Sequence, residues 1–403
     1  MGTIRKIFTK IVTPKINYQP LIEVRVFKDA LLFNLYSFQQ KYPKLLFAPV
    51  LKSNAYGHGL VEVAGILDEA NTTLSVPRMH SGHLPQRGRG GPKIPFFIVD
   101  SFYEALTLRQ HGIKTKILVL GYCREKELLS AKLKDVSFGI IDLQILKNLS
   151  IKLKKPLNIH LKIDTGMHRQ GILQSEVSES MAAIKSNPNI NLEGLCTHFA
   201  DADGADNKFT LGQIEKWNSA AVTFKNEFPN TKFFHASNTA AAGYAEHINA
   251  NVSRLGIGLY GINPSSNIKL ELKPALELRS IISSTKNIPA GEKVGYGVTF
   301  ESSKPMIVAT VPVGYNEGVD RRLSNKGAFK VNGVFCPIVG RVSMNMSSID
   351  VTDVIDVKIE DFVVVISSNK TDKNSVENLA KLCECIPYEI LVHIPQHLRR
   401  RVV

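Results

Sequence analysis

The residues best suited to chemistry stand in one short segment, PVLKSNAYGHG, at positions 49–59. An apolar run over 45–51 predicts a buried strand that ends at Lys52. A glycine-containing turn follows, and then an apolar segment over 60–67 that favours a helix. A lysine amine in this place can form a Schiff base with a carbonyl compound, while backbone N–H groups of the turn can lie close to an anion. The alternative interpretation is a surface lysine at an ordinary strand-to-helix turn.

Further segments combine basic, hydroxyl or aromatic side chains with glycine. They are LKIDTGMHR (161–169), THFA (197–200), HASNT (235–239), RLGIGLYG (254–261), VGYGVTF (294–300), VGY (313–315), GRVSM (340–344) and PYE (387–389). Together with LKSNAYGHG they resemble, in the right order and over nearly the full chain, the motifs of alanine racemases of fold type III. The resemblance implies an isomerase that holds pyridoxal 5'-phosphate on Lys52.

The implied reaction interconverts L-alanine and D-alanine and supplies D-alanine for peptidoglycan. Loss of the α-proton from a free amino acid is very unfavourable, and the cofactor's ring takes up the resulting charge. By resemblance, two bases act on opposite faces of the alanine–cofactor Schiff base. Lys52 serves the D-face, and Tyr296 reaches in on the L-face from a partner subunit. The resemblance therefore implies a homodimer whose active sites are completed in trans.

The resemblance also assigns the remaining site residues. Arg254 is expected at the pyridine nitrogen, where a permanent cation disfavours ring protonation and leaves simple proton exchange as the favoured reaction. His198 is expected to support Arg254. The cofactor phosphate is expected to bind the hydroxyls of Tyr56, Thr239 and Tyr388 and the backbone N–H groups of Gly256 and Ile257.

Two residues are expected to bind the substrate. Arg169 is the expected partner of the substrate carboxylate or of a cofactor oxygen, and Met344 is expected to contribute its backbone N–H from the other subunit. Lys162 matches a position that is carbamylated in some relatives. No metal site is expected, because His80 and His83 stand in a Gly/Arg-rich segment typical of a solvated loop.

The sequence departs from the family pattern at several positions. The usual GYADG reads GYNEG at 314–318, the usual Cys-Met-Asp reads Ser343-Met344-Asn345, and His168 stands where Gly is common. These changes leave open a broader amino-acid racemase, acting for example on serine or lysine. A non-catalytic pyridoxal-phosphate carrier is a second alternative, although Tyr296 and the second half of the chain argue against it. A third is an enzyme disabled by an insertion.

The elements that must position these residues can be predicted from an alternation, up to residue 264, of short apolar β-rich runs with longer amphipathic stretches. Helices are predicted between the strands, for example over 101–110, 176–186 and 211–227. Eight alternating strands favour a parallel (β/α)8 TIM barrel, in which the chemistry lies at the carboxyl ends of the strands. The predicted strands are 45–51, 96–99, 116–120, 136–141, 157–163, 192–197, 232–235 and 252–255.

The pattern changes after residue 264 to short β-rich segments separated by Gly and Pro, including 307–313, 335–339 and 362–366. We therefore expect a basic tail over 1–15, a barrel domain over 16–264 and a β-rich C-terminal domain over 265–403. A short helix is expected over 375–385, and the arginines at 399–401 are expected to form a solvated tail. Residues 75–94 differ in composition from their surroundings and are expected to be a surface insertion on the barrel face opposite the active site.

Composition restricts the remaining possibilities. The 403 residues are 44% hydrophobic and 21% charged, which is typical of a globular protein, and no apolar run approaches the ~20 residues needed to span a bilayer. The net charge of +14 is spread along the chain without a nucleic-acid-binding module. Five scattered cysteines favour reduced thiols. We expect a cytoplasmic protein that binds small molecules, with neither nucleic acid nor membrane as partner.

Overall fold

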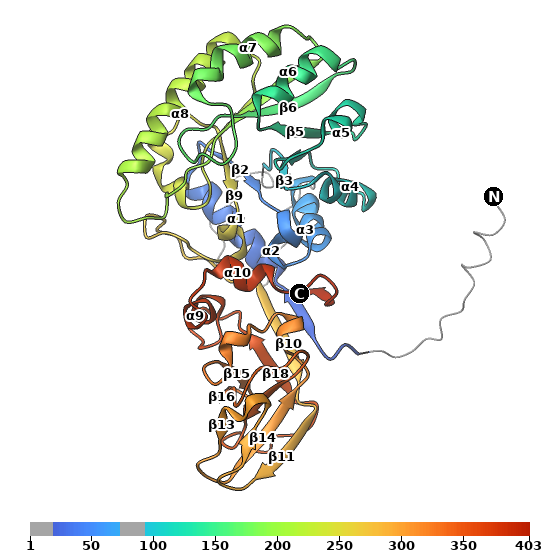
Figure 1. Ribbon diagram of the computed structural model, residues 1–403, viewed down its shortest axis with the longest axis vertical. Helices are drawn as coiled ribbons and strands as arrows, with labels where there is room; N and C mark the ends of the chain where they lie inside the picture. Colours follow the sequence, from blue (N-terminus) through green and yellow to red (C-terminus); the bar gives the residue numbers. More distant parts are fainter. Residues whose placement is uncertain (1–18, 73–92) are drawn as a thin grey trace, which may run out of the picture.

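The chain forms two bodies joined end to end, as Figure 1 shows: a barrel surrounded by helices, and a smaller β-rich part. The computed structural model describes residues 19–72 and 93–403. The predicted tail over 1–15 and nearly all of the predicted insertion over 75–94 lie outside the described residues.

Eight parallel strands form the barrel. Neighbouring strands from β3 to β8 are hydrogen-bonded in chain order, and β2 pairs with β9. Two backbone hydrogen bonds close the ring: Leu51 N–H donates to Ile98 O at 2.7 Å, and Asn251 N–H donates to Phe234 O at 3.0 Å. The strands are β2 (Leu46–Pro49), β3 (Phe97–Val99), β4 (Ile117–Val119), β5 (Val136–Ile140), β6 (Leu157–Lys162), β7 (Ile190–Cys196), β8 (Phe233–His235) and β9 (Val252–Leu255).

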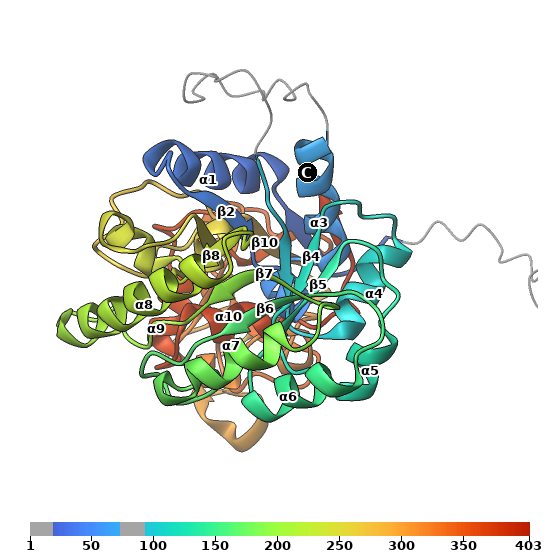
Figure 2. The same cartoon turned by 90° about the horizontal axis from the view of Figure 1, so that it is seen from above.

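The barrel helices surround these strands, as the view from above shows (Figure 2). They are α1 (Lys28–Lys41), α3 (Leu60–Thr72), α4 (Phe102–Gln110), α5 (Glu125–Ser130), α6 (Leu143–Lys152), α7 (Val177–Lys185) and α8 (Lys208–Glu227). Because helices cover the outer face and side chains fill the interior, the strands are nearly continuous apolar runs, which is why the sequence located them. The predicted α/β barrel with a β-rich C-terminal part is confirmed.

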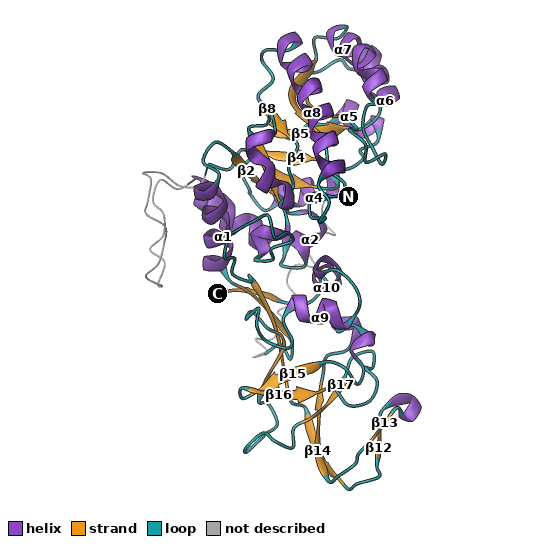
Figure 3. Cartoon of the chain, turned by 90° about the vertical axis from the view of Figure 1, so that its left-hand side faces the viewer, coloured by secondary structure: helices purple, strands orange, loops and turns teal. Residues whose placement is uncertain are grey.

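The second body is built on a six-stranded sheet of order β16-β15-β18-β10-β1-β19, with a three-stranded sheet β11-β14-β17 and a β12-β13 hairpin. Figure 3 shows that α9 and α10 lie between these strands and the barrel. The elements are β10 (Leu276–Ile281), β11 (Ser284–Ile288), β12 (Lys293–Val294), β13 (Phe300–Glu301), β14 (Met306–Val311), β15 (Ala328–Val331), β16 (Val334–Pro337), β17 (Ser347–Asp350), β18 (Phe362–Ile366), α9 (Val376–Leu382) and α10 (Pro387–Val392).

Both ends of the described chain enter this sheet. Strand β1 (Glu23–Val26) pairs antiparallel with β10 and parallel with β19 (Arg400–Val402). The prediction of a solvated tail at 399–401 is therefore wrong, because β19 completes its hydrogen bonds on β1 and the middle arginine is half-buried. One apolar core continues from the barrel into this sheet. Among residues 19–72 and 93–403, no helix is both long and apolar enough to cross a bilayer.

Candidate active site

A cavity of about 720 Å³ opens at the carboxyl ends of the barrel strands. This is the end at which loops of an α/β barrel gather functional side chains. Most of the residues singled out from the sequence line this cavity: Lys52, Tyr56, Arg169, His198, Thr239, Arg254, Gly256 and Tyr388. Ile257 follows Gly256 and is fully buried beside the cavity rather than in its lining.

Two predicted residues lie elsewhere. Tyr296 is 71% exposed in the turn between β12 and β13, and Met344 is 57% exposed. Figure 3 shows the β12-β13 hairpin at the far end of the molecule from the barrel. A single chain therefore does not bring Tyr296 or Met344 into the cavity, and these are the two residues that were expected to act from a partner subunit.

Lys52 opens a turn of left-handed helix, α2 (Lys52–Tyr56). The φ angles of the residues from Ser53 to Tyr56 lie between 50° and 56°. A left-handed helical conformation costs L-residues roughly 1–2 kcal/mol each, so the surrounding structure must hold this turn. Gly57 continues it at φ 80°, and a Cβ there would lie 2.1 Å from Leu391 O. The turn therefore packs directly on the backbone of α10, and only glycine fits at position 57.

Glu104 fixes the entrance to this turn. Its Oε1 accepts a hydrogen bond from Ser53 N–H at 2.8 Å, and its Oε2 accepts from Asp100 N–H at 2.8 Å. The same carboxylate forms the capping box of α4 with Ser101. Lys52 Nζ lies 4.0 Å from Asp100 Oδ1, and the lysine side chain is 46% exposed. The amine is thus accessible in the cavity with one carboxylate at the edge of ion-pair distance.

Arg254 is a buried cation whose contacts are neutral groups. Its Nη2 donates to Thr197 O at 2.7 Å and to Ala236 O at 2.9 Å, and lies 2.9 Å from His198 Nδ1. Burial, together with the neighbouring Arg254, lowers the pKa of His198 well below its usual value. A neutral His198 can accept the Arg254 hydrogen bond at Nδ1, which is the contact on which its expected supporting role depends.

A second buried chain runs from Arg254 into the barrel interior. Arg254 Nη1 lies 3.3 Å from His235 Nδ1, and His235 Nε2 lies 2.7 Å from His160 Nδ1. His160 Nε2 lies 3.5 Å from a carboxylate oxygen of Glu193. Because Arg254 only donates, His235 must accept at Nδ1 and donate from Nε2, and this fixes the tautomer of His160 in turn.

Glu193 ends this chain at the other side of the barrel core. It pairs with Lys116 and accepts a 2.5 Å hydrogen bond from Ser137 Oγ. Burial alone would raise the pKa of Glu193, but hydrogen bonds from His160, Lys116 and Ser137 outweigh it and lower the pKa to about 2. The ionised carboxylate thus supplies a negative charge toward which the two histidines are oriented. Sequence reasoning did not find this chain, although His235 was noted at a strand end.

Hydroxyl and backbone N–H groups form a small cradle in the cavity lining. Thr239 Oγ1 accepts from Gly256 N–H at 3.2 Å and Gly258 N–H at 3.3 Å. A Cβ on Gly256 would lie 3.0 Å from the Tyr56 hydroxyl oxygen, so glycine leaves room for an anion there. Burial raises the pKa of Tyr56. Burial and, as the smaller cause, the negative charge of Asp203 raise the pKa of Tyr388 to about 12. Both phenols therefore remain protonated and can donate.

The cavity carries an excess of positive charge. Lys52, Lys162, Arg169 and Arg254 line it, against the two carboxylates of Asp100 and Asp203. Burial lowers the pKa of Lys162, which is 6% exposed. Such a lining fits a ligand with a phosphate and a carboxylate. Sequence reasoning missed several polar lining residues, although each lies in the segment that follows a barrel strand: Asp100 after β3, Tyr122 after β4, Gln170 after β6, Asp203 after β7 and Asn238 after β8.

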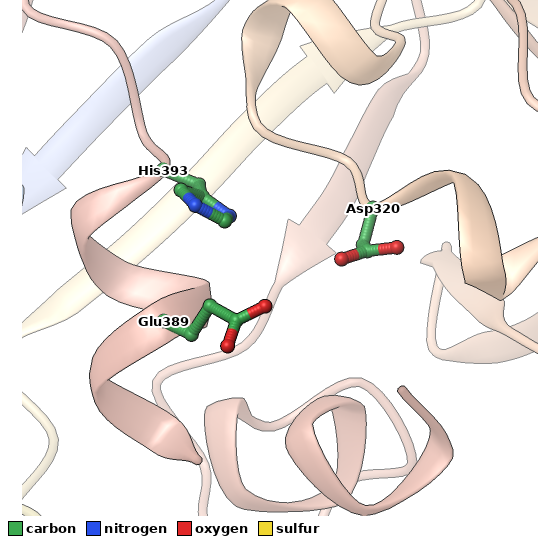
Figure 4. Close-up of side chains that lie close together, drawn as sticks. All are labelled: Asp320, Glu389 and His393. Atoms are coloured by element: carbon green, nitrogen blue, oxygen red, sulfur yellow. The ribbon is translucent and has the colours of Figure 1, made fainter. Parts of the chain in front are cut away.

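A cluster of metal-ligand types lies near the cavity. Asp320, Glu389 and His393 bring their ligand atoms within 4.8 Å of one another (Figure 4). Arg322 Nη2 already donates to Asp320 at 2.7 Å and to Glu389 at 2.8 Å. The guanidinium pairs with both carboxylates, so this cluster is explained as an ion-pair network that fixes α10.

The barrel and this cavity define a lysine-centred site for an anionic ligand, and comparisons with known proteins agree. Models of the alanine racemase N-terminal and C-terminal domains match residues 26–264 and 275–402. An alanine racemase of Methanococcus maripaludis is 35% identical over 366 residues, which cover 89% of this chain and 92% of that relative. An alanine racemase of Lactobacillus gasseri is also 35% identical over 366 residues, covering 87% and 89%.

Solved structures agree with these relatives. The structure of alanine racemase from Bacillus anthracis with bound L-Ala-P has a TM-score of 0.83 at 28% identity, with 96% of each chain covered. The biosynthetic alanine racemase of Pseudomonas aeruginosa has a TM-score of 0.78 at 26% identity and covers 96% of this chain and 100% of that one. The chain belongs to the alanine racemase family. Its members are pyridoxal-phosphate-dependent isomerases, so the family and enzyme class predicted from the sequence are confirmed.

Proposed function

We propose that this protein interconverts L-alanine and D-alanine with pyridoxal phosphate, by a two-base mechanism. The single observation that carries the proposal is the cavity itself, which places an accessible lysine amine, a buried arginine and a cradle of hydroxyl and N–H donors around one space. These three groups match an aldehyde, a pyridine nitrogen and a phosphate, which together describe the cofactor.

The residues present fit the cofactor. Lys52 would hold it covalently through its amine. Tyr56, Thr239, Tyr388 and the backbone N–H groups of Gly256 and Ile257 would hold the phosphate, and Arg254 would face the ring nitrogen. When bound, pyridoxal phosphate supplies a conjugated ring that takes up the charge left by loss of the substrate α-proton. Burial lowers the pKa of Arg254, but a guanidinium is so basic that it keeps its positive charge. Because its contacts are neutral groups, no carboxylate offsets this charge at the place where a proton would otherwise bind the ring.

The chain's own residues then hold and move the proton. Lys52 Nζ would accept or donate it on the D-face, and the Tyr296 hydroxyl from a second copy of the chain would do so on the L-face. Arg169 lines the cavity with Lys162 and would orient the substrate carboxylate, while Met344 N–H from the second copy would complete this contact. Lys162, whose pKa is lowered by burial, is the proposed position of a carbamate.

The proposal includes a homodimer. Tyr296 and Met344 are exposed, and the β12-β13 hairpin that carries Tyr296 extends away from the barrel of its own chain. Exposed apolar side chains accompany them on the same part of the molecule: Val298, Tyr315 and Met346. A second copy that covers these side chains would bring Tyr296 to the cavity of its partner.

Alanine is the proposed substrate because the relatives described above carry that name. Asn345, the departure that favoured a broader specificity, donates to Glu317 Oε1 at 2.6 Å. We further propose a cytoplasmic enzyme that supplies D-alanine to the cell wall. The five cysteines are free, four of them buried, which agrees with a reducing compartment.

The test is D-alanine formation from L-alanine by the purified protein, with and without added pyridoxal phosphate. Cofactor-dependent D-alanine formation is expected, with serine and lysine tested alongside. Bound cofactor without turnover of any of the three amino acids would contradict the proposal in favour of a carrier. Turnover of serine or lysine above alanine would instead favour the broader racemase.

A further inference from the structure

The three arginines at 399–401 have different environments although they are adjacent in sequence. The side chains of Arg399 and Arg401 border a surface hollow lined by further arginines, and both residues are exposed. Arg400 points the other way, because successive residues of a strand alternate between its two faces. Its guanidinium lies against the turn that follows Lys52.

Arg400 makes an unusual set of hydrogen bonds. Nε and Nη2 both donate to Gly57 O, at 3.3 and 2.9 Å. The other contacts all go to backbone carbonyls of the segment after α10: Ile394 at 3.4 Å, Pro395 at 2.8 Å, Gln396 at 2.9 Å and Leu398 at 2.6 Å. One guanidinium thus gathers five carbonyl groups from two segments that are more than 300 residues apart in sequence.

The elements that these two segments follow both contribute to the cavity lining. Gly57 ends the left-handed turn that begins at Lys52, and α10 carries Tyr388. The turn already packs on the backbone of α10, because Gly57 approaches Leu391 O. Four consecutive residues with positive φ do not hold themselves in place, so external contacts must hold them. Glu104 holds the beginning of the turn, and Arg400 holds its end.

We propose that Arg400 is a positioning residue for the active site: it locks the left-handed turn of Lys52 to the segment after α10. The lysine amine and the Tyr388 hydroxyl then keep a fixed separation before the cofactor arrives. The role requires the shape of the guanidinium and not merely its charge. A lysine ammonium is a single point with three donors and cannot donate to Gly57 O while also reaching the four carbonyls of the other segment.

The inference rests on the proposed function only for its effect on the active site, because the effect of Arg400 on the left-handed turn can be measured without cofactor. Amide hydrogen exchange in the cofactor-free protein reports it at Ala55, Gly57 and Gly59, whose N–H groups hydrogen-bond within or just before the turn. Arg400→Ala should accelerate exchange at these amides roughly tenfold or more, with barrel strands β5 and β6 unchanged. Arg399→Ala and Arg401→Ala are the matched controls and should exchange as the unmodified protein does.

Arg400→Lys separates geometry from charge. We expect it to exchange like Arg400→Ala, and it carries the same measurement if the alanine variant does not fold. In the same variants the dissociation constant for pyridoxal phosphate should rise roughly tenfold, which corresponds to about 1.4 kcal/mol, while the controls keep theirs.

Three results would overturn the proposal. Equal exchange at residues 55–59 in Arg400→Ala and Arg399→Ala would show that the contacts do not hold the turn. Acceleration throughout the barrel would show a general loss of stability instead, and full rescue by lysine would reduce the role to charge. If the unmodified protein neither binds pyridoxal phosphate nor forms D-alanine, the proposed function fails, whereas the exchange result still decides the role of Arg400.

Discussion

Tyr296 is the residue on which the two-base mechanism depends most directly. Tyr296→Phe removes the hydroxyl that would accept the proton on the L-face and leaves the cavity of its own chain untouched. We expect reaction from L-alanine to fall roughly a hundredfold or more, because a positioned acid or base contributes about that much. Cofactor binding, followed by visible absorbance, should stay within about twofold. Parallel loss of cofactor binding and activity would contradict the assignment of Tyr296 as a base.

His58 should make the stability of the protein depend on pH. It is fully buried next to the turn, and burial lowers its pKa to about 4. In the unfolded chain the histidine binds a proton below about pH 6.5, whereas in the folded protein it does so only near pH 4. Stability is therefore complete above pH 6.5 and falls between pH 6.5 and 4, by up to about 1.4 kcal/mol per pH unit for this group.

Denaturant unfolding of His58→Asn at several pH values between 7 and 4 tests this expectation. Loss of the His58 imidazole should remove up to about one bound proton from the pH dependence of the unfolding free energy. Burial also lowers the pKa of His160, His198 and His235, so the remaining dependence keeps the same sign. Identical slopes for the unmodified protein and His58→Asn would refute the assignment.

At the scale of single residues, the sequence indicated which residues belong to the candidate site but did not predict the contacts that hold them in place. The LKSNAYGHG motif located the lysine, and the strand that precedes it explained its position. Nothing in Ser53 or Ala55 predicts a positive φ, since neither is glycine or asparagine. The chain from Arg254 through His235 to Glu193 was equally hidden, because it joins side chains of different strands inside the barrel.

Among the elements, α4 connects helix capping to the active site through Glu104. Glu104→Gln keeps one oxygen but cannot accept from both Ser53 N–H and the Asp100–Ser101 backbone. We expect the free energy of unfolding to fall by roughly 1–3 kcal/mol and the affinity for pyridoxal phosphate to weaken as well.

Glu127 supplies the matched control for this prediction. Its carboxylate accepts from Arg124 N–H at 2.9 Å at the start of α5, and it is not among the residues that line the cavity. Glu127→Gln should lower stability slightly and leave the cofactor affinity unchanged. A loss of affinity in both variants would mean that capping acts through general stability rather than through the lysine turn.

The barrel strands were predictable because each is an apolar run covered on both sides. Strands β1 and β19 could not be predicted in this way. Strand β1 contains only two buried valines, and β19 begins with two adjacent arginines. Both become strands through partners far away in the chain, and local patterns do not report such contacts. The error about residues 399–401 has this origin: a run of arginines is usually solvated, and the sheet on which it lies cannot be seen from its neighbours.

For the whole molecule, the proposed dimer can be tested with two inactive variants. Lys52→Ala removes the lysine of its own cavity, and Tyr296→Phe removes the tyrosine donated to the partner. In a hybrid dimer, one of the two sites combines a native Lys52 with a native Tyr296. Random mixing makes half of the dimers hybrid, so about a quarter of the full activity should return.

The measurement is racemase activity after joint refolding of the two variants, with each variant refolded alone as the control. Activity no greater than the sum of the separate controls would show that Lys52 and Tyr296 do not meet across subunits. The sequence predicted the two-body architecture, whereas the joining of the copies rests on resemblance and on the exposure of Tyr296 and Met344.

The position of β1 has a consequence for the order in which the protein matures on the ribosome. Strand β10 begins at Leu276, 250 residues after β1 ends at Val26 (276 − 26), and β19 follows only at Arg400. The barrel strands can therefore pair with one another before β10 and β19, the two sheet neighbours of β1, have been synthesised. Because β1 lies inside the finished sheet, a chain cut after residue 264 keeps an unpaired strand, and the remaining half loses an internal one. The second body thus depends on a strand that precedes the barrel in the chain, and this strand stays without sheet partners until β10 and β19 have been made.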